Sequence, residues 1–361
     1  MNRTIRKVGV LGSGIMGSRI ACHFANIGVE VLLLDIAPRE LNEEEKKKGL
    51  TLDHPAVKNR IVQSSFDAAF KSNPAPLFNK KFASRISLGN FTDDMHRIKE
   101  CDWTIEVVVE NLEIKRKVYE EVEKHRKPGT LVTSNTSGIP IHLMAEGRSE
   151  DFRKHFCGTH FFNPPRYLRL LEIIPTPSTD PEIVKFLMHY GDLFLGKTTV
   201  LCKDTPAFIA NRVGVYSIMK VVDSMRKLDL NIDEVDKLTG PVIGRPKSAT
   251  FRTSDVVGLD TMIKVSQNLH SSLESDEARD MFKLPEVITK LEQNKWLGDK
   301  TGQGFYKKTK NAKGETEILT LDLATLEYKP KAKARFATLE TTKGIDDLRK
   351  RFKVLLAGAD K

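Results

Sequence analysis

The sequence predicts an α/β fold in which a doubly wound, mostly parallel sheet is followed by an all-α C-terminal domain. Short buried strands alternate with amphipathic helices over residues 7–134, and helical segments alone recur from residue 207 to about residue 296. Such alternation is typical of parallel sheets with helical crossovers. The 361 residues are enough for two domains. We expect the sheet domain at 1–204, the helical domain at 205–308 and a basic tail or linker at 309–361.

One continuous pattern predicts the first three elements. Residues 7–11 read as a buried strand that runs into Gly12-Ser13-Gly14-Ile15-Met16-Gly17, a G-x-G-x-x-G turn. Apolar residues at helical spacing cover 15–27, and 29–35 form a second buried strand that ends in Asp35. Strand, glycines, helix, strand and acid in this order make up the dinucleotide fingerprint of a Rossmann-type domain.

Each part of the fingerprint has a physical task. Gly12 permits the tight turn, Gly14 lets a pyrophosphate approach the backbone, and Gly17 lets the helix pack closely on the strand. Asp35 accepts from ribose hydroxyls and repels a 2′-phosphate, which favours NAD over NADP, although Arg39 lies close enough to weaken that preference. We therefore expect NAD as the cofactor, held by Gly12, Gly14, Ile15, Met16, Gly17 and Asp35.

The strand–helix alternation continues beyond Asp35. A charged, helix-prone region at 40–70 leads into a proline-containing loop at 71–81. The next elements are a buried strand at 102–109, an amphipathic helix at 112–126 and a buried strand at 130–134.

Polar residues follow the last two of these strands. Glu110, Asn111 and Lys115 follow the first, and Asn135 and Ser137 follow the second. Ligands of doubly wound sheets bind at the carboxyl ends of strands, so these side chains are expected to reach a nicotinamide ribose and a substrate. The alternative for Asn111 and Ser137 is a role as helix N-caps.

The segment Gly158-Thr159-His160-Phe161-Phe162-Asn163-Pro164-Pro165 places a histidine and an asparagine in an apolar run, and Glu172 follows in a second one. Burying a base and an acid costs several kcal/mol unless they pair. We expect His160 and Glu172 to pair. The alternative is a structural histidine with an unrelated strand glutamate.

Beyond Asp204-Thr205-Pro206 the alternation of strands and helices ends. Residues 207–226 form an apolar helix that carries Asn211, and helical segments recur to about residue 296. From 307 onward the sequence holds one weak strand at 317–321 and a basic helix near its end, without a core of its own.

Composition narrows the class of protein. Residues 306–361 hold 14 basic and 8 acidic residues, which is +6 of the net +10, and no basic stripe with interleaved aromatics occurs, so nucleic-acid binding is not expected. Neither a signal region nor an apolar stretch of about 18 residues is present, which predicts a cytoplasmic protein without a membrane span. The four cysteines lack metal spacing and are expected to be buried free thiols, so no metal is implied.

These motifs resemble the 3-hydroxyacyl-CoA dehydrogenase family over roughly residues 5–308. The resemblance rests on the glycine fingerprint and on six further motifs in matching order and spacing: Val109-Glu110-Asn111, Ser134-Asn135-Thr136-Ser137, Gly158 to Pro164, Ala210-Asn211-Arg212, Asp255-Val256-Val257-Gly258-Leu259-Asp260 and Lys300-Thr301-Gly302-Gln303-Gly304-Phe305-Tyr306.

The resemblance implies oxidation of an (S)-3-hydroxyacyl-CoA to a 3-oxoacyl-CoA in fatty-acid β-oxidation. His160 is then the general base, and Glu172 orients its ring. Ser137 and Asn211 bind the reacting oxygen. Glu110, Lys115, Asn135, Ser137 and Asn163 position the cofactor or substrate.

The stretches 165–170 and 245–250 are closer to the long bacterial version, in which a helical repeat and an enoyl-CoA hydratase module follow. Residues 309–361 are therefore expected to lead toward such a module. Residues 50–82 match the family's coenzyme A-contacting hairpin poorly, which leaves Lys58 and Arg60 as candidates for contacts with coenzyme A.

The family also implies a homodimer through the helical domain. Its apolar positions Val213, Val215, Ile218, Met219 and Val222 suit either that interface or the domain's own core.

Three alternatives stay open at this point. The chain could be a dehydrogenase of a free 3-hydroxy acid, which would not require a CoA thioester. It could be a non-catalytic NAD-binding protein, a reading that the presence of both His160 and Glu172 disfavours. It could also be a piece of a multifunctional enzyme that binds NAD but turns over poorly alone.

Overall fold

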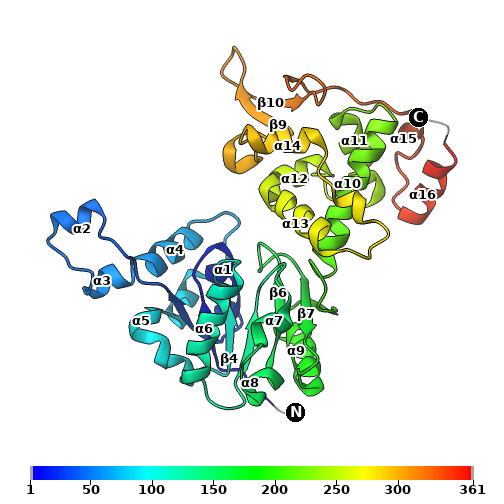
Figure 1. The fold of residues 1–361 in the computed structure, drawn as a ribbon. Coiled ribbons are helices and arrows are strands. Elements are labelled where there is room, and N and C mark those ends of the chain that lie inside the picture. The colour runs from blue at the N-terminus through cyan, green and yellow to red at the C-terminus, as the bar shows by residue number, and fades with distance from the viewer. Residues whose placement is uncertain (1–2, 359–361) are drawn as a thin grey trace. The chain divides into compact units, whose positions relative to one another are not determined.

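The computed structural model describes residues 3–358, which fall into two compact units (Figure 1). The first unit ends at Ile209 and the second begins at Ala210. No helix within the described residues is long and apolar enough to cross a membrane.

The first unit is built on one eight-stranded sheet in the order β3-β2-β1-β4-β5-β6-β7-β8. All neighbouring pairs are parallel except β6 and β7, which are antiparallel. This is the predicted doubly wound, mostly parallel sheet. Its strands are β1 (Lys7–Leu11), β2 (Glu30–Asp35), β3 (Ile86–Asn90), β4 (Trp103–Glu106), β5 (Leu131–Ser134), β6 (Phe156–Phe161), β7 (Leu170–Pro175) and β8 (Thr198–Leu201).

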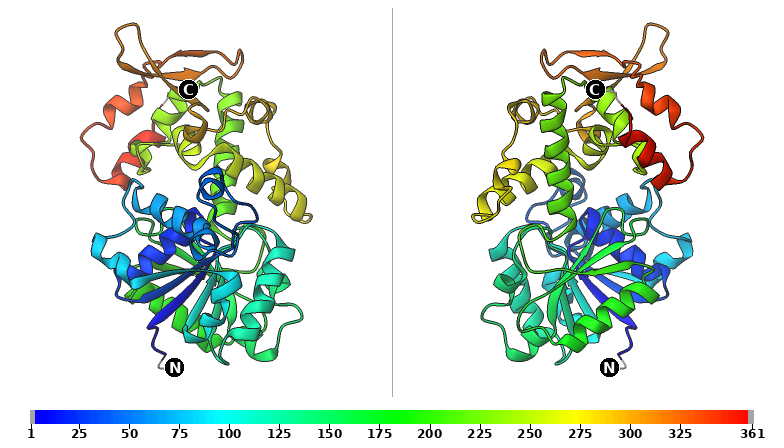
Figure 2. Two further views of the ribbon diagram at one scale, coloured as in Figure 1. Left: turned by 90° about the vertical axis from the view of Figure 1, so that its left-hand side faces the viewer. Right: turned by 90° about the vertical axis from the view of Figure 1, so that its right-hand side faces the viewer.

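Helices cover both faces of this sheet (Figure 2). The helices of this unit are α1 (Ile15–Asn26), α2 (Glu43–Lys47), α3 (Pro55–Lys58), α4 (Arg60–Phe70), α5 (Phe91–Asp94), α6 (Leu112–His125), α7 (Ile141–Ala145), α8 (Glu150–Lys154) and α9 (Pro181–Leu193), with short 3₁₀ turns at Lys80–Arg85 and Met95–Glu100. Side chains of α1, α4 and α9 share one core cluster, whereas α6, α7 and α8 share the other.

Alternation along the strands separates the two cores. Val31 and Leu33 of β2 point into the first cluster, and Leu32 and Leu34 point into the second. Because both faces are buried, the strand reads as a continuous apolar run. Because β1, β2, β4 and β5 are parallel, their carboxyl ends lie at the same end of the sheet, where the predicted site residues follow them.

The second unit is mainly helical. Its helices are α10 (Ala210–Lys227), α11 (Ile232–Leu238), α12 (Phe251–Val257), α13 (Leu259–Ser272), α14 (Glu286–Gln293), α15 (Ala337–Thr341) and α16 (Leu348–Leu356), with 3₁₀ turns at Pro241–Ile243, Arg279–Phe282 and Asp299–Thr301. An antiparallel sheet in the order β11-β10-β9 joins them, formed by β9 (Tyr306–Lys310), β10 (Thr316–Leu321) and β11 (Tyr328–Pro330).

This sheet corrects the expectation that residues 205–308 are entirely helical, because β9 already begins at Tyr306. Asp255 of α12 explains the strand's position: its carboxylate accepts from the backbone N–H groups of Phe305 (2.9 Å) and Tyr306 (2.8 Å). A Cβ at Gly304 would lie 2.2 Å from the same carboxylate, so the close approach requires glycine. Residues beyond 309 continue this sheet, and Leu321 is buried in the unit.

The four cysteines are free and buried, as expected. Of the five apolar positions of α10, Val215, Met219 and Val222 are buried, whereas Val213 is 58% exposed.

Candidate functional site

The turn between β1 and α1 has the geometry of a dinucleotide loop. Gly12 has a φ of 104°, and its N–H donates to Leu34 O over 2.8 Å. A Cβ at Gly17 would lie 1.8 Å from Gly12 O, so α1 could not pack this closely with any larger residue. At Gly14 a Cβ would meet no atom within 4 Å, and no side chain caps the first turn of α1. Open space beside free helix N–H groups fits a pyrophosphate.

Asp35 ends β2 beside this turn. Its Oδ2 accepts from the Ser13 N–H (2.6 Å) and hydroxyl (2.5 Å), and its Oδ1 accepts from the Ile36 N–H (2.7 Å). Each carboxylate oxygen has two lone pairs, so Oδ1 retains capacity for a ribose hydroxyl. Ile15 beside the turn is 70% exposed, whereas Met16 packs against the first core cluster.

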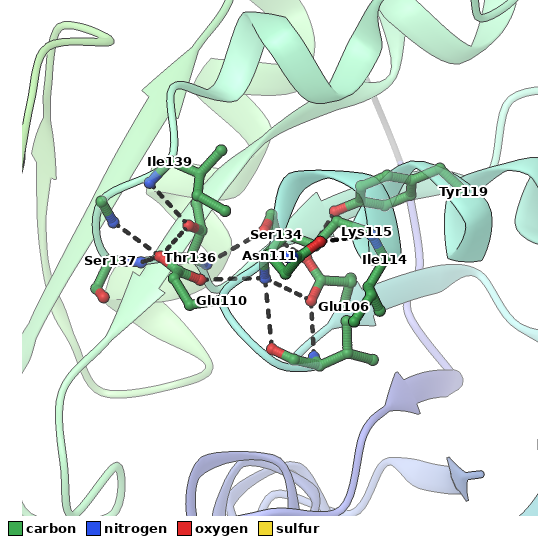
Figure 3. A network of polar contacts seen from close by, with 12 residues as sticks. Glu106, Glu110, Asn111, Ile114, Lys115, Tyr119, Ser134, Thr136, Ser137 and Ile139 are labelled. Atoms are coloured by element: carbon green, nitrogen blue, oxygen red, sulfur yellow. Dashed lines mark hydrogen bonds and ion pairs between the residues drawn. The ribbon is translucent and has the colours of Figure 1, made fainter.

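Glu106, at the end of β4, organises a buried polar network that the sequence analysis did not identify (Figure 3). The residue is fully buried, and its carboxylate accepts from Lys115 Nζ (2.7 Å), Ser134 Oγ (2.6 Å) and Tyr119 OH (3.0 Å). Burial, and secondarily the charge of Glu106, raises the pKa of Tyr119, so its hydroxyl stays a donor. The sequence feature that could have revealed this network is the acidic residue Glu106 at the end of an otherwise apolar, buried strand.

Glu110 connects this network to the loop after β5. Its Oε1 accepts from Thr136 Oγ1 (2.5 Å) and from the N–H groups of Ser137 and Gly138 (both 3.0 Å), and its Oε2 lies 3.3 Å from Lys115 Nζ (Figure 3). Burial alone would raise the pKa of Glu110, but Lys115 and these hydrogen bonds outweigh it, so the pKa is lowered. An ionised Glu110 therefore shapes the loop that carries Ser137.

The structure decides between roles for three residues of this region. Asn111 is the N-cap of α6 and accepts from the Ile114 N–H (3.0 Å). Ser137 is not a cap, because α7 begins only at Ile141. Lys115 is only 1% exposed, and its ammonium group lies between Glu106 and Glu110.

His160 and Glu172 are brought together as cross-strand neighbours of the antiparallel pair β6 and β7. His160 Nδ1 lies 2.7 Å from Glu172 Oε2, and both residues are buried. Along their strands, His160 and Glu172 alternate with Phe161, Leu171 and Ile173, whose side chains belong to the first core cluster. The side chains of His160 and Glu172 therefore point to the opposite face of the sheet. The ring of Phe208 lies 5.7 Å from the imidazole ring. The pair is therefore an oriented imidazole with its Nε2 left for a ligand.

Two asparagines flank the pair. Asn135 Oδ1 accepts from the N–H of Phe161 (2.8 Å), which ties the loop after β5 to β6. Asn163 is exposed, and its Oδ1 accepts from Arg19 of α1 (2.5 Å). Arg19 was not identified from the sequence, where it appears as one basic residue on a helix.

Asn211 is the second residue of α10 and belongs to the second unit. Two residues before it, the Ile209 N–H donates to Glu172 Oε1 over 3.1 Å.

The two candidates for coenzyme A contacts are already engaged by carboxylates. Lys58 Nζ lies 3.0 Å from Asp93 and 3.7 Å from Asp53, and Arg60 pairs with Glu45. Neither cation is a free phosphate ligand in this arrangement.

Two family models match consecutive parts of the chain and together cover most of it. The model for the 3-hydroxyacyl-CoA dehydrogenase NAD binding domain matches residues 7–205, and the model for the C-terminal domain of the same family matches 208–308. The chain belongs to the 3-hydroxyacyl-CoA dehydrogenase family. Its cofactor is therefore NAD, which fits the open turn at Gly14 and the carboxylate of Asp35.

Individual relatives agree with this assignment. A protein of Bacillus subtilis named "Probable 3-hydroxyacyl-CoA dehydrogenase" is 50% identical over all 361 residues, and one of Deinococcus radiodurans with the same name is 43% identical over 88% of this chain and 86% of its own length. The crystal structure of (S)-3-hydroxybutyryl-CoA dehydrogenase from Ralstonia eutropha aligns with a TM-score of 0.65 and 26% identity, over 83% of this chain and 98% of the other. The chain spans 45% of the length of the Bacillus subtilis relative.

Proposed function

We propose that this chain is an NAD-dependent dehydrogenase that oxidises (S)-3-hydroxyacyl-CoA to 3-oxoacyl-CoA in fatty-acid β-oxidation. The observation that carries the proposal is the His160–Glu172 pair, because a buried imidazole oriented by a carboxylate is an arrangement suited to proton abstraction from a hydroxyl. NAD, when bound, supplies the hydride acceptor.

In the proposed mechanism His160 is the base. With Nδ1 bonded to Glu172, Nε2 is the nitrogen that takes the proton from the substrate's 3-hydroxyl. The carboxylate of Glu172 then stabilises the imidazolium and holds the ring in place. Burial of both groups excludes water, which strengthens their interaction.

The remaining residues are proposed to bind and orient. Ser137 and Asn211 hold the oxygen that changes from alcohol to ketone. Asn135, whose side chain accepts from the Phe161 N–H next to the base, and Asn163, three residues after the base, position the nicotinamide end of the cofactor or the substrate. Glu110 reaches the same ligands from the segment between β4 and α6. For Lys115 the proposed role is indirect, since its ammonium group holds Glu110 in place.

The test follows loss of NADH absorbance with acetoacetyl-CoA as oxidant substrate, which is the reverse of the proposed reaction. We expect turnover by the native chain, a loss of about 10²–10⁴-fold in H160A and a loss of at least about tenfold in E172Q, since an amide can select the wrong tautomer. H142A is the matched control, because His142 is an exposed histidine that also pairs with an acid, Asp204. Native activity in H160A would contradict the proposed base.

Two other functions are outcomes of the same assay. Reduction of free acetoacetate at a rate similar to acetoacetyl-CoA would identify a dehydrogenase of free 3-hydroxy acids. NADH binding without turnover of either compound would identify a non-catalytic NAD-binding protein, or a piece that needs further modules.

A homodimer through the second unit is also proposed. The support is the exposure of Val213 (58%) and Tyr216 (37%) on α10. V213K should convert a dimer into a monomer in light scattering. A monomeric native chain would contradict the proposal.

A further inference from the structure

The loop 162–169 joins the two strands that carry the proposed base and its partner. His160 lies near the end of β6, and Glu172 is the third residue of β7. In a pair of antiparallel strands, the connecting loop sets the register. A slip by one residue would turn either side chain to the opposite face of the sheet.

Lys197, just before β8, holds this loop from the protein interior. The residue is only 4% exposed, and its Nζ donates to Pro165 O and to Leu168 O, the latter over 2.8 Å. Directly after it, the Thr198 N–H donates to Arg169 O over 2.7 Å. Residues 197 and 198 thus bind three carbonyls of the loop, from segments about thirty positions apart in sequence.

Lys197 has no acidic partner that would explain a buried ammonium group. Among residues 3–358 no aspartate or glutamate forms an ion pair with it, and the Phe161 ring lies 5.9 Å from its Nζ. Burial lowers the pKa of Lys197 to about 8. Burial, and secondarily Lys197, lowers the pKa of the neighbouring His23 to about 4, so His23 is neutral near pH 7 and adds no second charge.

A second set of hydrogen bonds joins the loop to residues 75–77. Arg166 donates to Ala75 O (2.7 Å) and Leu77 O (3.0 Å), and the Tyr167 hydroxyl donates to Ala75 O (3.1 Å). Because Arg166 and Tyr167 are consecutive residues of the loop, its middle is bound on one side by residues 75–77 and on the other by Lys197.

We propose that Lys197 is a positioning residue, which fixes loop 162–169 and through it the alignment of His160 with Glu172 and the place of Asn163. The proposal rests on the proposed function of that pair. Removing the ammonium group leaves the carbonyls of Pro165 and Leu168 without this donor, so the loop relaxes and the pair loses its alignment. The glycine turn at 12–17 lies on other elements and keeps its place, so its contacts with the pyrophosphate are retained.

The experiment compares K197M with the native chain and with K185M, whose lysine is 73% exposed on α9. We expect K197M to lower kcat about 10–100-fold, because misplacement by about 1 Å can cost that much, and to change the dissociation constant of NADH by a smaller factor, because the turn at 12–17 and Asp35 are unaffected. K185M should equal the native chain in both measurements.

Proton NMR gives a readout that does not depend on activity. The downfield Hδ1 signal of the His160–Glu172 hydrogen bond, assigned by its loss in H160A, should shift upfield or broaden in K197M. A folded K197M with native kcat and a native Hδ1 signal would overturn the proposal. If K197M does not fold, K197Q decides: its amide is one bond shorter and cannot reach both carbonyls, so native kcat and a native signal in folded K197Q would overturn it equally.

The outcomes also separate this proposal from the function itself. Absence of turnover in the native chain would contradict the dehydrogenase proposal alone. The Hδ1 signals of the native chain and K197M would then still test the positioning role.

Discussion

At the scale of single residues, Glu106 and Lys115 form the most deeply buried ion pair described. Their side chains are 0% and 1% exposed, and the nitrogen–oxygen distance is 2.7 Å. The hydroxyls of Tyr119 and Ser134 complete the hydrogen bonding of Glu106. Such pairs are weak sources of net stability, but a broken one leaves an uncompensated buried charge.

K115M should therefore be strongly destabilising. We expect a loss of about 3–5 kcal/mol in the free energy of unfolding, measured by urea denaturation, and partial recovery in E106Q/K115M, where the orphaned charge is removed. K124M is the matched control, because Lys124 is an exposed lysine of the same helix bonded to Glu121. Equal stability of K115M and K124M would contradict the importance of the pair.

At the scale of elements, the turn between β1 and α1 contains two glycines with different physical constraints. Gly17 has no room for a Cβ, since Gly12 O lies 1.8 Å from its ideal position, whereas Gly14 borders open space. One glycine serves packing and the other serves the approach of a ligand.

Substituting the two glycines should separate these effects. G17A is expected to lose about 1–3 kcal/mol or more of unfolding free energy, because the helix must move away from the strand. G14A should keep the native melting temperature while its affinity for NADH falls about tenfold, since a methyl group would stand where a pyrophosphate approaches. Fluorescence titration with NADH and thermal melts measure both quantities. Native NADH affinity in G14A would count against this placement of the pyrophosphate.

At the scale of the whole molecule, the second unit depends on contacts between its helices and its C-terminal sheet. Asp255 of α12 binds the backbone where β9 begins, and Asp233 accepts from Thr320 Oγ1 (3.0 Å) and the Ala332 N–H (2.7 Å). Residues beyond 309 therefore take part in the packing of the unit.

Substitutions on β10 test this participation. L321A removes a side chain that is 2% exposed and should cost about 2–5 kcal/mol of unfolding free energy. I318A, three residues earlier at 50% exposure, should change it by no more than about 0.5 kcal/mol. Equal effects of the two substitutions would show that β10 adds little to the unit.

Asp255 should also give the unit a pH-dependent stability. Burial raises its pKa to about 6 from an ordinary value of 3.8, despite the two backbone N–H bonds. A carboxyl that holds its proton more tightly in the folded state stabilises the fold below pH 3.8, and this contribution is lost as the pH rises through about 6.

The native chain should therefore lose about 2–3 kcal/mol relative to D255N between pH 4 and pH 6.5, measured by urea denaturation across that range. D346N changes an exposed aspartate of the same unit, and its free energy of unfolding should vary with pH as that of the native chain does. A constant difference between D255N and the native chain would contradict the raised pKa.

Local patterns predicted much of the fold and part of the site. The β1–α1–β2 unit was readable because its glycines, helical spacing and final Asp35 act over short distances in sequence. The pairing of His160 with Glu172 was readable because two buried charged groups in apolar strands need each other. For Asn111 the sequence left a ligand contact and an N-cap role open, and the structure shows the N-cap.

Other features depended on distant parts of the chain. The strands β3 and β8 are short, lie at the two edges of the sheet and have little apolar pattern of their own. The C-terminal sheet exists because Asp255 and Asp233 bind segments that lie fifty to a hundred residues further on.

The sequence by itself determined the cofactor class, the doubly wound sheet and the two residues most suited to acid–base chemistry, since each is encoded by neighbouring residues of defined type and spacing. Only the tertiary structure decided which residues support the site: Glu106 binds Ser134 at the end of β5, Arg19 binds Asn163, and Lys197 binds the loop between β6 and β7. A buried charge is stable only beside a partner, and the fold, rather than the local sequence, determines which residue that partner is.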